Sequence, residues 1–199
     1  MPSADRPVDG LRERKKARTR AEIQSHALRL FRAQGYDATT VAQIIEEAEV
    51  SQSTFFRYFP TKADLVLTDE FDPVIVAAFQ AQPADLGVIP ALRAAFRVAL
   101  SQLSESELAD QRERTALSLS VPELRGAMLD QFASAMTLLA DIVAERTGRP
   151  TQDPAVRTLA GAVVGAAVAV IFAGADDPWA DLPDQLDDAL ARLETGLVL

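Results

Sequence analysis

The feature that most restricts the fold is a very short connection between two amphipathic segments. Residues 40–48 and 51–59 carry apolar side chains at helical spacing, and the turn Ala48-Glu49-Val50 joins them. Two helices joined by so short a turn cannot pack side by side, so the second must cross the first. Ile44 and Ile45, with the apolar turn residues, are expected to fill the corner. The spacing therefore predicts a helix-turn-helix.

Helical periodicity continues along most of the chain, and no segment alternates convincingly at a period of two. Caps, glycines and prolines mark the ends of the expected helices. These helices cover residues 14–35, 40–48, 51–59, 61–67, 90–103, 105–119, 120–148, 153–173 and 181 onward. Pro73 lies inside a further helical pattern, where we expect a kink or a break, and Pro90 is expected at a first helical position. The predicted fold class is all-α with about nine helices.

Charge is distributed unevenly along this acidic chain. The net charge is −9, yet residues 1–62 hold eleven basic against eight acidic residues, and the remainder holds nine against twenty-one. Much of the positive charge forms one run: Arg12, Arg14, Lys15, Lys16, Arg18 and Arg20. A basic head on an acidic body suits a protein that contacts phosphates at one end. The alternative is a solvated helix face with a loose tail.

The second short helix offers polar side chains that suit DNA recognition. With the apolar residues holding the corner, the side chains left to project outward toward base edges or phosphates are Gln52, Ser53, Thr54 and Arg57. The capped helix starts at Thr40, Ser51 and Thr61 add free amide donors for phosphate oxygens. A short helical hairpin with polar tips can also be purely structural, and this alternative stays open on these observations alone.

An ordered series of residues extends across the whole of Thr19–Leu67. Its elements are Ile23, Ala27 and Phe31, then Gly35-Tyr36, Thr39-Thr40-Val41, Ile44-Ile45, Ala48-Glu49-Val50-Ser51 and Thr54-Phe55-Phe56-Arg57-Tyr58-Phe59 with Lys62 and Leu65. This series resembles the DNA-binding domain of the TetR family over its whole length. The resemblance implies that Thr40 and Lys62 hold phosphates. It also implies that Gln52, Ser53 and Thr54 face the groove, with Tyr58 at the backbone-contacting end.

Two positions depart from the pattern of that family. Glu49 stands where the turn usually has glycine, so this residue must adopt a strained backbone or form a different turn. Phe56 stands where tyrosine is common, so the phosphate contact of that hydroxyl is lost or passes to Tyr58. Neither departure threatens the expected fold.

The C-terminal part resembles the family only in its helical layout, which implies ligand binding and dimerisation. We therefore expect a flexible tail over residues 1–13, the DNA-binding domain over 14–61 and the ligand-binding and dimerisation domain over 62–199. The helix from Pro154 is apolar nearly all round, so two faces need covering. The expected dimer interface comprises Gly161, Gly165, Val168, Leu186, Leu190 and Leu193. The alternative is burial of this helix wholly within one monomer.

A ligand cavity is expected between helices of the C-terminal domain. Its candidate lining is Phe79, Phe96, Met128, Phe132, Met136 and Phe172. Methionine and phenylalanine favour a deformable site for a greasy or aromatic molecule, although the same residues suit a plain core. The Phe55–Phe59 stretch and Asp72-Pro73 resemble a branch of the family associated with acyl-CoA-like ligands.

Other classes of function find little support in the residues. The absence of cysteine removes disulfides, thiolate metal sites and cysteine nucleophiles, and His26 is the one histidine. We expect no metal, no cofactor and no catalysis, since no phosphate loop or nucleophile elbow occurs. The uncharged stretch 158–175 is mostly Ala, Gly and Val, and the first ten residues lack a secretion pattern. We therefore expect a cytoplasmic protein without a membrane span.

The sequence supports one mechanism above its rival. A homodimer places two recognition helices in successive major grooves of palindromic double-stranded operator DNA, and a small apolar effector spreads the two DNA-binding domains and lowers affinity. Such a protein is a repressor that the effector releases. The rival is a helical ligand-binding protein or enzyme in which the hairpin is only scaffold.

Overall fold

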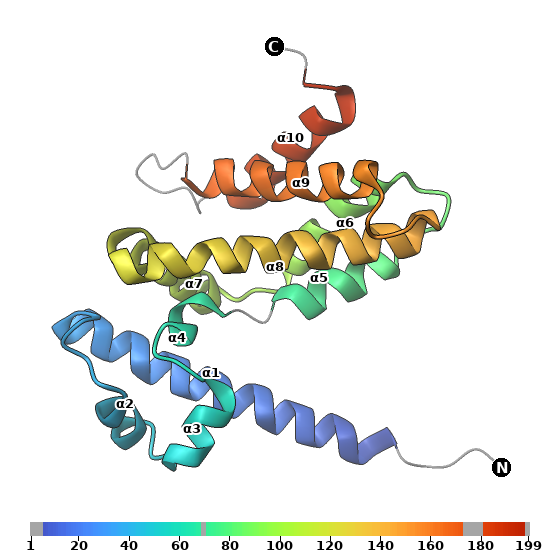
Figure 1. The fold of residues 1–199 in the computed structure, drawn as a ribbon. Coiled ribbons are helices and arrows are strands. Elements are labelled where there is room, and N and C mark those ends of the chain that lie inside the picture. The colour runs from blue at the N-terminus through green and yellow to red at the C-terminus, as the bar shows by residue number, and fades with distance from the viewer. Residues whose placement is uncertain (1–5, 69–70, 173–180, 198–199) are drawn as a thin grey trace. The chain divides into compact units, whose positions relative to one another are not determined.

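The chain folds into α-helices alone over the residues that the structure describes. The structure is a computed structural model, and it describes residues 6–68, 71–172 and 181–197. Ten α-helices and no strand occur in these ranges, which confirms the predicted all-α class (Figure 1). Contacts divide the chain into two compact units. We call residues 1–68 with 110–127 the head unit, and residues 69–109 with 128–199 the body unit.

The head unit contains four helices of its own. These are α1 (Arg6–Gln34), α2 (Val41–Glu47), α3 (Gln52–Tyr58) and α4 (Asp64–Leu67). The C-terminal part of α7 (Glu105–Ser120) and the first turn of α8 (Pro122–Thr147) complete the unit. Its fully buried core joins these elements through Ile23, Ala27, Ile44, Phe55, Phe59, Leu65 and Leu124.

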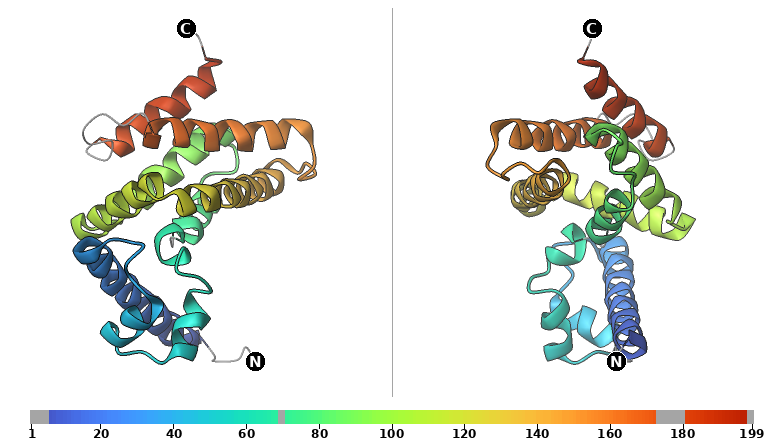
Figure 2. Two further views of the ribbon diagram at one scale, coloured as in Figure 1. Left: turned by 60° about the vertical axis from the view of Figure 1, so that its left-hand side comes forward. Right: turned by 90° about the vertical axis from the view of Figure 1, so that its right-hand side faces the viewer.

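The body unit is a bundle that includes α5 (Phe71–Gln80), α6 (Val88–Ser101), α9 (Pro154–Phe172) and α10 (Leu182–Thr195). Helix α6 contacts both α5 and α10, and α10 also lies across α9, as Figure 2 shows. The rest of α8 contributes Leu139, Ile142 and Val143 to the buried core of this unit. The division by contacts thus differs from a boundary at residue 61, because the segment 110–127 belongs to the head.

Most helix ends lie where the sequence predicts them. Gly35 and Gly148 follow α1 and α8 with φ of 86° and 64°, a left-handed conformation that glycine adopts without strain. Other features differ from the prediction. Helix α1 begins at Arg6, so residues 6–13 are helical rather than a tail. Helix α6 begins at Val88, which puts Pro90 in the first turn but not first. Pro73 lies in the first turn of α5, where its missing N–H costs nothing and no kink is needed.

Helices α8 and α9 are long and apolar enough, by length and composition alone, to cross a membrane. The core helix of a soluble protein meets the same criteria. Only 22% of the most apolar stretch of α9 is buried within the described chain. Most of its other residues are partly buried, and Gly165, Ala169 and Phe172 are exposed, so part of the apolar surface of this helix is left open within the protomer.

Candidate nucleic-acid interface

Helix α2 begins at a reciprocal cap. The Gln43 amide donates to the Thr40 hydroxyl at 3.2 Å, and the Thr40 amide donates to the Gln43 side-chain oxygen at 2.8 Å. Such a capping box satisfies amides that the helix itself cannot pair. The Thr40 side chain is exposed, as a phosphate contact requires. Gln43 was not among the predicted site residues, although its position three residues after Thr40 is the signal of this cap.

The turn between α2 and α3 is closed by backbone hydrogen bonds. The Ala48 amide donates to the Ile44 carbonyl at 2.9 Å, and the Val50 amide donates to the Ile45 carbonyl at 3.2 Å. Glu49 adopts φ of 51°, the left-handed region, so the glycine-like backbone is kept with a glutamate. Ile44 is fully buried under the corner, as predicted. The turn is therefore a strained version of a regular helix-turn-helix corner.

Helix α3 separates an apolar inner face from a polar outer face. Phe55 and Phe59 are fully buried, and their rings lie 6.0 Å apart. Of the residues predicted on the outer face, Gln52, Ser53 and Arg57 are exposed. Thr54 and Tyr58 are half-buried. The guanidinium of Arg57 stacks on the Tyr58 ring at 5.1 Å. This arrangement presents hydrogen-bonding groups along one side of a short helix.

Ser51 both caps α3 and orders the hydroxyls beside it. The Thr54 amide donates to the Ser51 hydroxyl at 3.1 Å. The same hydroxyl donates to the Thr54 side-chain oxygen at 2.8 Å and lies 3.0 Å from that of Ser53. The first turn of α3 is thus a preordered cluster of small polar groups.

Phe56 places an exposed aromatic ring without a hydroxyl on α3. Its ring is 43% exposed and meets Phe55 edge-on, with centroids 5.3 Å apart. The ring borders an open groove between α2 and α3 whose other lining residues are Val41, Ala42, Ile45, Glu46, Glu49, Val50 and Gln52. No hydroxyl stands at this position to donate to a phosphate.

Lys62 lies against the loop between α1 and α2 rather than opening a helix. Its ammonium donates to the carbonyls of Tyr36 and Thr39, at 3.0 and 3.2 Å, and lies 4.0 Å from the centroid of the Tyr36 ring. Helix α4 begins at Asp64, whose carboxylate accepts from the Thr61 amide at 2.7 Å. Lys62 therefore fixes the residues that precede the Thr40 cap.

Tyr36 is a buried phenol at the centre of these contacts. It is 3% exposed, and its hydroxyl has no hydrogen-bond partner within the described chain. Burial, followed by the negative charges of Glu123, Asp37 and Asp64, raises the pKa of Tyr36 to about 12. The phenol therefore stays neutral at physiological pH.

Helices α1 and α7 support the end of α4. The Gln24 side-chain amide donates to the carbonyls of Leu65 and Thr68, at 3.2 and 3.0 Å. The Arg114 guanidinium donates to the Thr68 carbonyl at 3.0 Å. Contacts of this kind, from a side-chain donor to a distant backbone carbonyl, carry no sequence pattern, so the sequence did not reveal Gln24 or Arg114 as positioning residues.

The residues expected at the dimer interface are divided between core and surface. Leu186 and Leu190 are 6% and 0% exposed inside the core of their own body unit, so they are unavailable to a partner. Gly161 faces the Met136 sulfur, 3.8 Å from its would-be Cβ, Gly165 is exposed, and Val168 is half-buried. Leu193 lines an open groove between α9 and α10. The other lining residues of the groove are Ala162, Ala166, Ala169, Val170, Gln185, Asp188, Ala189, Arg192 and Leu197.

The residues expected at a ligand cavity do not form one set. Phe79 is 1% exposed in the core, with the Arg146 guanidinium over its ring, so it is a packing residue. Phe96 is half-buried against the same core, and Met128 is half-buried. Phe132 and Phe172 do meet, with ring centroids 6.3 Å apart, and Met136 and Phe172 are both partly exposed. Only these last three share a region of α8 and α9.

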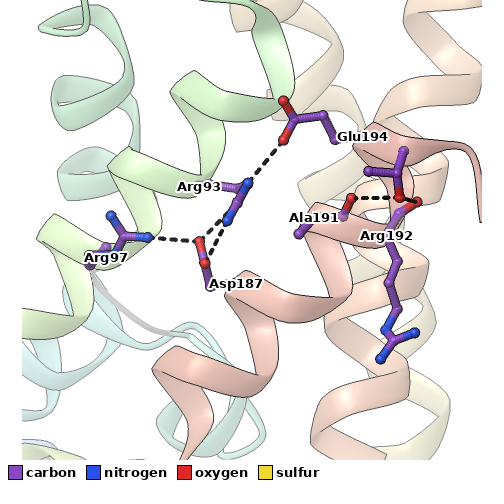
Figure 3. A network of polar contacts seen from close by, with 7 residues as sticks. Arg93, Arg97, Asp187, Ala191, Arg192 and Glu194 are labelled. Carbon is purple, nitrogen blue, oxygen red and sulfur yellow. Dashed lines mark hydrogen bonds and ion pairs between the residues drawn. The ribbon is translucent and has the colours of Figure 1, made fainter.

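A charged network ties α6 to α10 in the body unit (Figure 3). Arg93 donates twice to the Asp187 carboxylate, at 2.9 and 2.7 Å, and once to Glu194 at 2.9 Å. Arg97 donates to the same Asp187 at 3.0 Å. The hydrogen bonds from Arg93 hold the pKa of Asp187 below its ordinary value.

Among the described residues no group of three His, Cys, Asp or Glu side chains could hold a metal ion.

A capped helix lying across another, with a polar outer face and a rigid corner, defines a helix-turn-helix DNA-binding protein. Comparison with known families agrees. The description "Bacterial regulatory proteins, tetR family" matches residues 23–68, and "MftR C-terminal domain" matches residues 86–198. The chain belongs to the TetR family of transcriptional regulators. It is therefore a DNA-binding regulator of transcription and not an enzyme.

Individual relatives support the same assignment. The HTH-type transcriptional regulator TcmR of Streptomyces glaucescens is 36% identical over 151 residues, which cover 72% of this chain and 67% of that protein. MftR of Mycobacterium tuberculosis, named for the regulation of mycofactocin biosynthesis, is 28% identical over 187 residues. These residues cover 92% of this chain and 93% of that protein. Among solved structures, FadR of Thermus thermophilus in complex with lauroyl-CoA matches with a TM-score of 0.51. Its sequence is 25% identical, and the match covers 90% of this chain and 95% of the FadR chain.

Proposed function

We propose that this protein is a cytoplasmic repressor that binds a palindromic operator as a homodimer and is released by a small apolar ligand. The observation that carries the proposal is the exposed polar face of α3, held by the Ser51 cap and the buried Phe55 and Phe59. A helix presented in this way fits the major groove, where each base pair shows a distinct set of donors and acceptors.

The side chains of the head divide into two roles in this proposal. Gln52, Ser53 and Thr54 face base edges, since they occupy the exposed first turn of α3. Thr40, Ser51, Arg57, Tyr58 and Lys62 contact phosphates. An ammonium has three donors and Lys62 uses two on carbonyls, so the third can point to a phosphate oxygen. Phosphate contacts position the protein, and base contacts select the sequence.

The groove between α9 and α10 supports the homodimer. Its small side chains, Ala162, Ala166 and Ala169, allow another helix to approach closely, and Gly165 on α9 is exposed. A twofold symmetric pair of these grooves would cover the apolar surface that α9 leaves open. A palindromic operator follows, because two identical heads read two identical half-sites.

The effector is proposed to bind in the body unit near Phe132, Met136 and Phe172. Two aromatic rings and a methionine, partly exposed on α8 and α9, suit an apolar ligand. Acyl-CoA thioesters are the first class to test, because the FadR structure at 25% identity contains lauroyl-CoA. The ligand lowers operator affinity if it favours a dimer whose heads do not match the spacing of the half-sites.

Selection of random duplex DNA by the purified protein tests this function. Repeated half-sites in inverted orientation, recovered at low salt, are the expected result. A protein with Gln52, Ser53 and Thr54 all replaced by alanine is the matched control, and it should enrich no such sequence. Titration of acyl-CoA esters into the operator complex then tests release. Failure of the native protein to enrich any sequence would favour the rival, a helical ligand-binding protein with a structural hairpin.

A further inference from the structure

The N-terminal half of α1 contributes little to the folding of the head. Helix α1 has 29 residues, and among those whose side chains the structure describes, the buried apolar residues begin at Ile23. The family match to the DNA-binding domain also begins at residue 23. Figure 1 shows this half of the helix extending past α3. The described side chains between Arg12 and Glu22 include no buried residue, so packing in the core does not explain this part of the helix.

A basic stripe continues the inner face of α1 into this extension. Arg12, Lys16 and Arg20 follow one another at four-residue spacing, and Ile23 and Ala27 come three and four residues further. Residues at these spacings lie on one face of a helix. Since Ile23 and Ala27 pack in the core with Phe55 and Phe59 of the α3 segment, the basic stripe is directed to the same side as α3. Lys15, adjacent to the stripe, is exposed as well.

Arg20 locates the stripe relative to the recognition helix. Its guanidinium lies over the Phe59 ring at 4.9 Å, and Phe59 directly follows the last residue of α3. From Arg20 back to Arg12 the helix advances about 12 Å, at about 1.5 Å per residue. The duplex has one phosphate per about 3.4 Å of axis on each strand, so this length matches roughly three phosphates.

The negative net charge of the chain makes a local basic surface favourable for DNA binding. With a net charge of −9, the protein as a whole is repelled by DNA. The exposed side chains Arg12, Lys15 and Lys16 form a local concentration of positive charge. A helix-turn-helix on an acidic protein gains affinity from a basic extension that follows the backbone beyond the half-site.

We propose that Arg12 and Lys16 of the basic stripe, together with the adjacent Lys15, form a second DNA contact outside the helix-turn-helix, which binds the sugar-phosphate backbone flanking each half-site. This inference deepens the proposed DNA interface and rests on it. The stripe reads no base, so it raises affinity for any duplex that extends far enough. It leaves the preference among half-site sequences to α3.

A triple variant, Arg12→Gln/Lys15→Gln/Lys16→Gln, tests the stripe in the full chain. Glutamine is a good helix former and all three sites are exposed, so thermal unfolding should be unchanged. The control is Arg149→Gln/Arg157→Gln, which removes positive charge from exposed sites of the body unit. Affinity is measured against salt on two duplexes that carry the same sites, one trimmed to the half-sites and one with a helical turn of flanking DNA.

On the extended duplex the slope of log affinity against log salt should become shallower by about 0.9 per lost phosphate contact, or roughly 3 for one protomer. The control should keep the native slope, and on the trimmed duplex the triple variant should match the native protein. The proposal would be overturned if the triple variant and the native protein had equal salt slopes on the extended duplex. It would also be overturned if the control variant lost as much of its slope as the triple variant. The triple variant should show the same shallower slope on an extended duplex of random sequence, because phosphate contacts do not depend on sequence. This measurement tests the basic contact even if no operator has been identified.

Discussion

Glu49 keeps a backbone conformation that suits glycine better. Its φ of 51° places an L-residue in the left-handed region, which costs about 1–2 kcal/mol for residues with a Cβ. Glu49→Gly removes that cost but also gives the unfolded chain more freedom. We expect a net gain of about 1 kcal/mol in the free energy of unfolding, measured by urea denaturation. Glu46→Gly, at an exposed helical position of α2, should instead lose about 1 kcal/mol. A loss at both positions would contradict the strain at Glu49.

Substitutions of Gln52 and Lys62 should change DNA binding in different ways. Gln52 is exposed in the first turn of α3, so Gln52→Ala should change which base is preferred at one operator position, by about 1–3 kcal/mol of discrimination. Lys62→Met keeps an unbranched chain but removes the ammonium that holds the Tyr36 and Thr39 carbonyls. It should weaken binding to every sequence similarly and lower the salt slope by about 1. Competition binding across single-base operator variants measures both. A changed base preference in Lys62→Met would contradict the assignment.

The sequence predicted residues well where the signal is local. Ser51 caps α3 because its hydroxyl reaches an amide three residues on, and Gly35 ends α1 because few other residues adopt its φ. Leu186 and Leu190 show the limit. Periodicity correctly placed them on one face of a helix, but it does not tell whether that face is covered by the same chain or by a partner. Lys62 was expected at a helix start, and its contacts with residues 36 and 39 depend on tertiary packing.

At the scale of helices, α1 was predicted too short for a related reason. Hydrophobic periodicity begins near Ala17, and the buried apolar residues among the described side chains begin at Ile23, so the pattern marks the packed part of the helix and not its whole length. Pro7 and Asp9 were the available signals, since proline and acidic residues favour the first turn of a helix. Helices α7 and α8 each contribute to both units, which no pattern of apolar residues reveals.

The link between α6 and α10 should depend on pH. Asp187 is 23% exposed and accepts from both Arg93 and Arg97, which lower its pKa from the ordinary 3.8. A carboxyl with a lowered folded pKa stabilises the protein above its ordinary value, and this contribution is lost as pH falls through the folded value. Asp187→Asn should therefore cost about 1–2 kcal/mol at pH 7, and the difference should shrink below pH 3.8. Urea unfolding at pH 7 and pH 3 measures it. Asp130→Asn, at an exposed carboxyl of α8, is the control, and a pH-independent cost at Asp187 would contradict the argument.

For the whole molecule, dimerisation determines whether one α3 helix becomes a specific repressor. The body unit leaves Gly165, Ala169 and Phe172 of α9 exposed, and Ala169 lies in the groove beside α10. A carboxylate there, in Ala169→Asp, would be buried without a partner in a symmetric interface, so the variant should sediment as a monomer at micromolar concentration. Its unfolding should remain that of a folded helical chain, because Ala169 is exposed within the protomer.

Loss of the dimer should then appear in DNA binding as a loss of avidity. Two linked heads bind a palindrome about 10²–10⁴-fold more tightly than one head binds a half-site. Ala169→Asp should therefore lose that factor on the palindrome and bind an isolated half-site as the native protein does. Ala109→Asp, which adds the same charge at an exposed site of α7, should remain dimeric and keep full affinity. If Ala169→Asp remained a dimer with native affinity, the groove between α9 and α10 would not be the interface, and the apolar surface of α9 would need another partner.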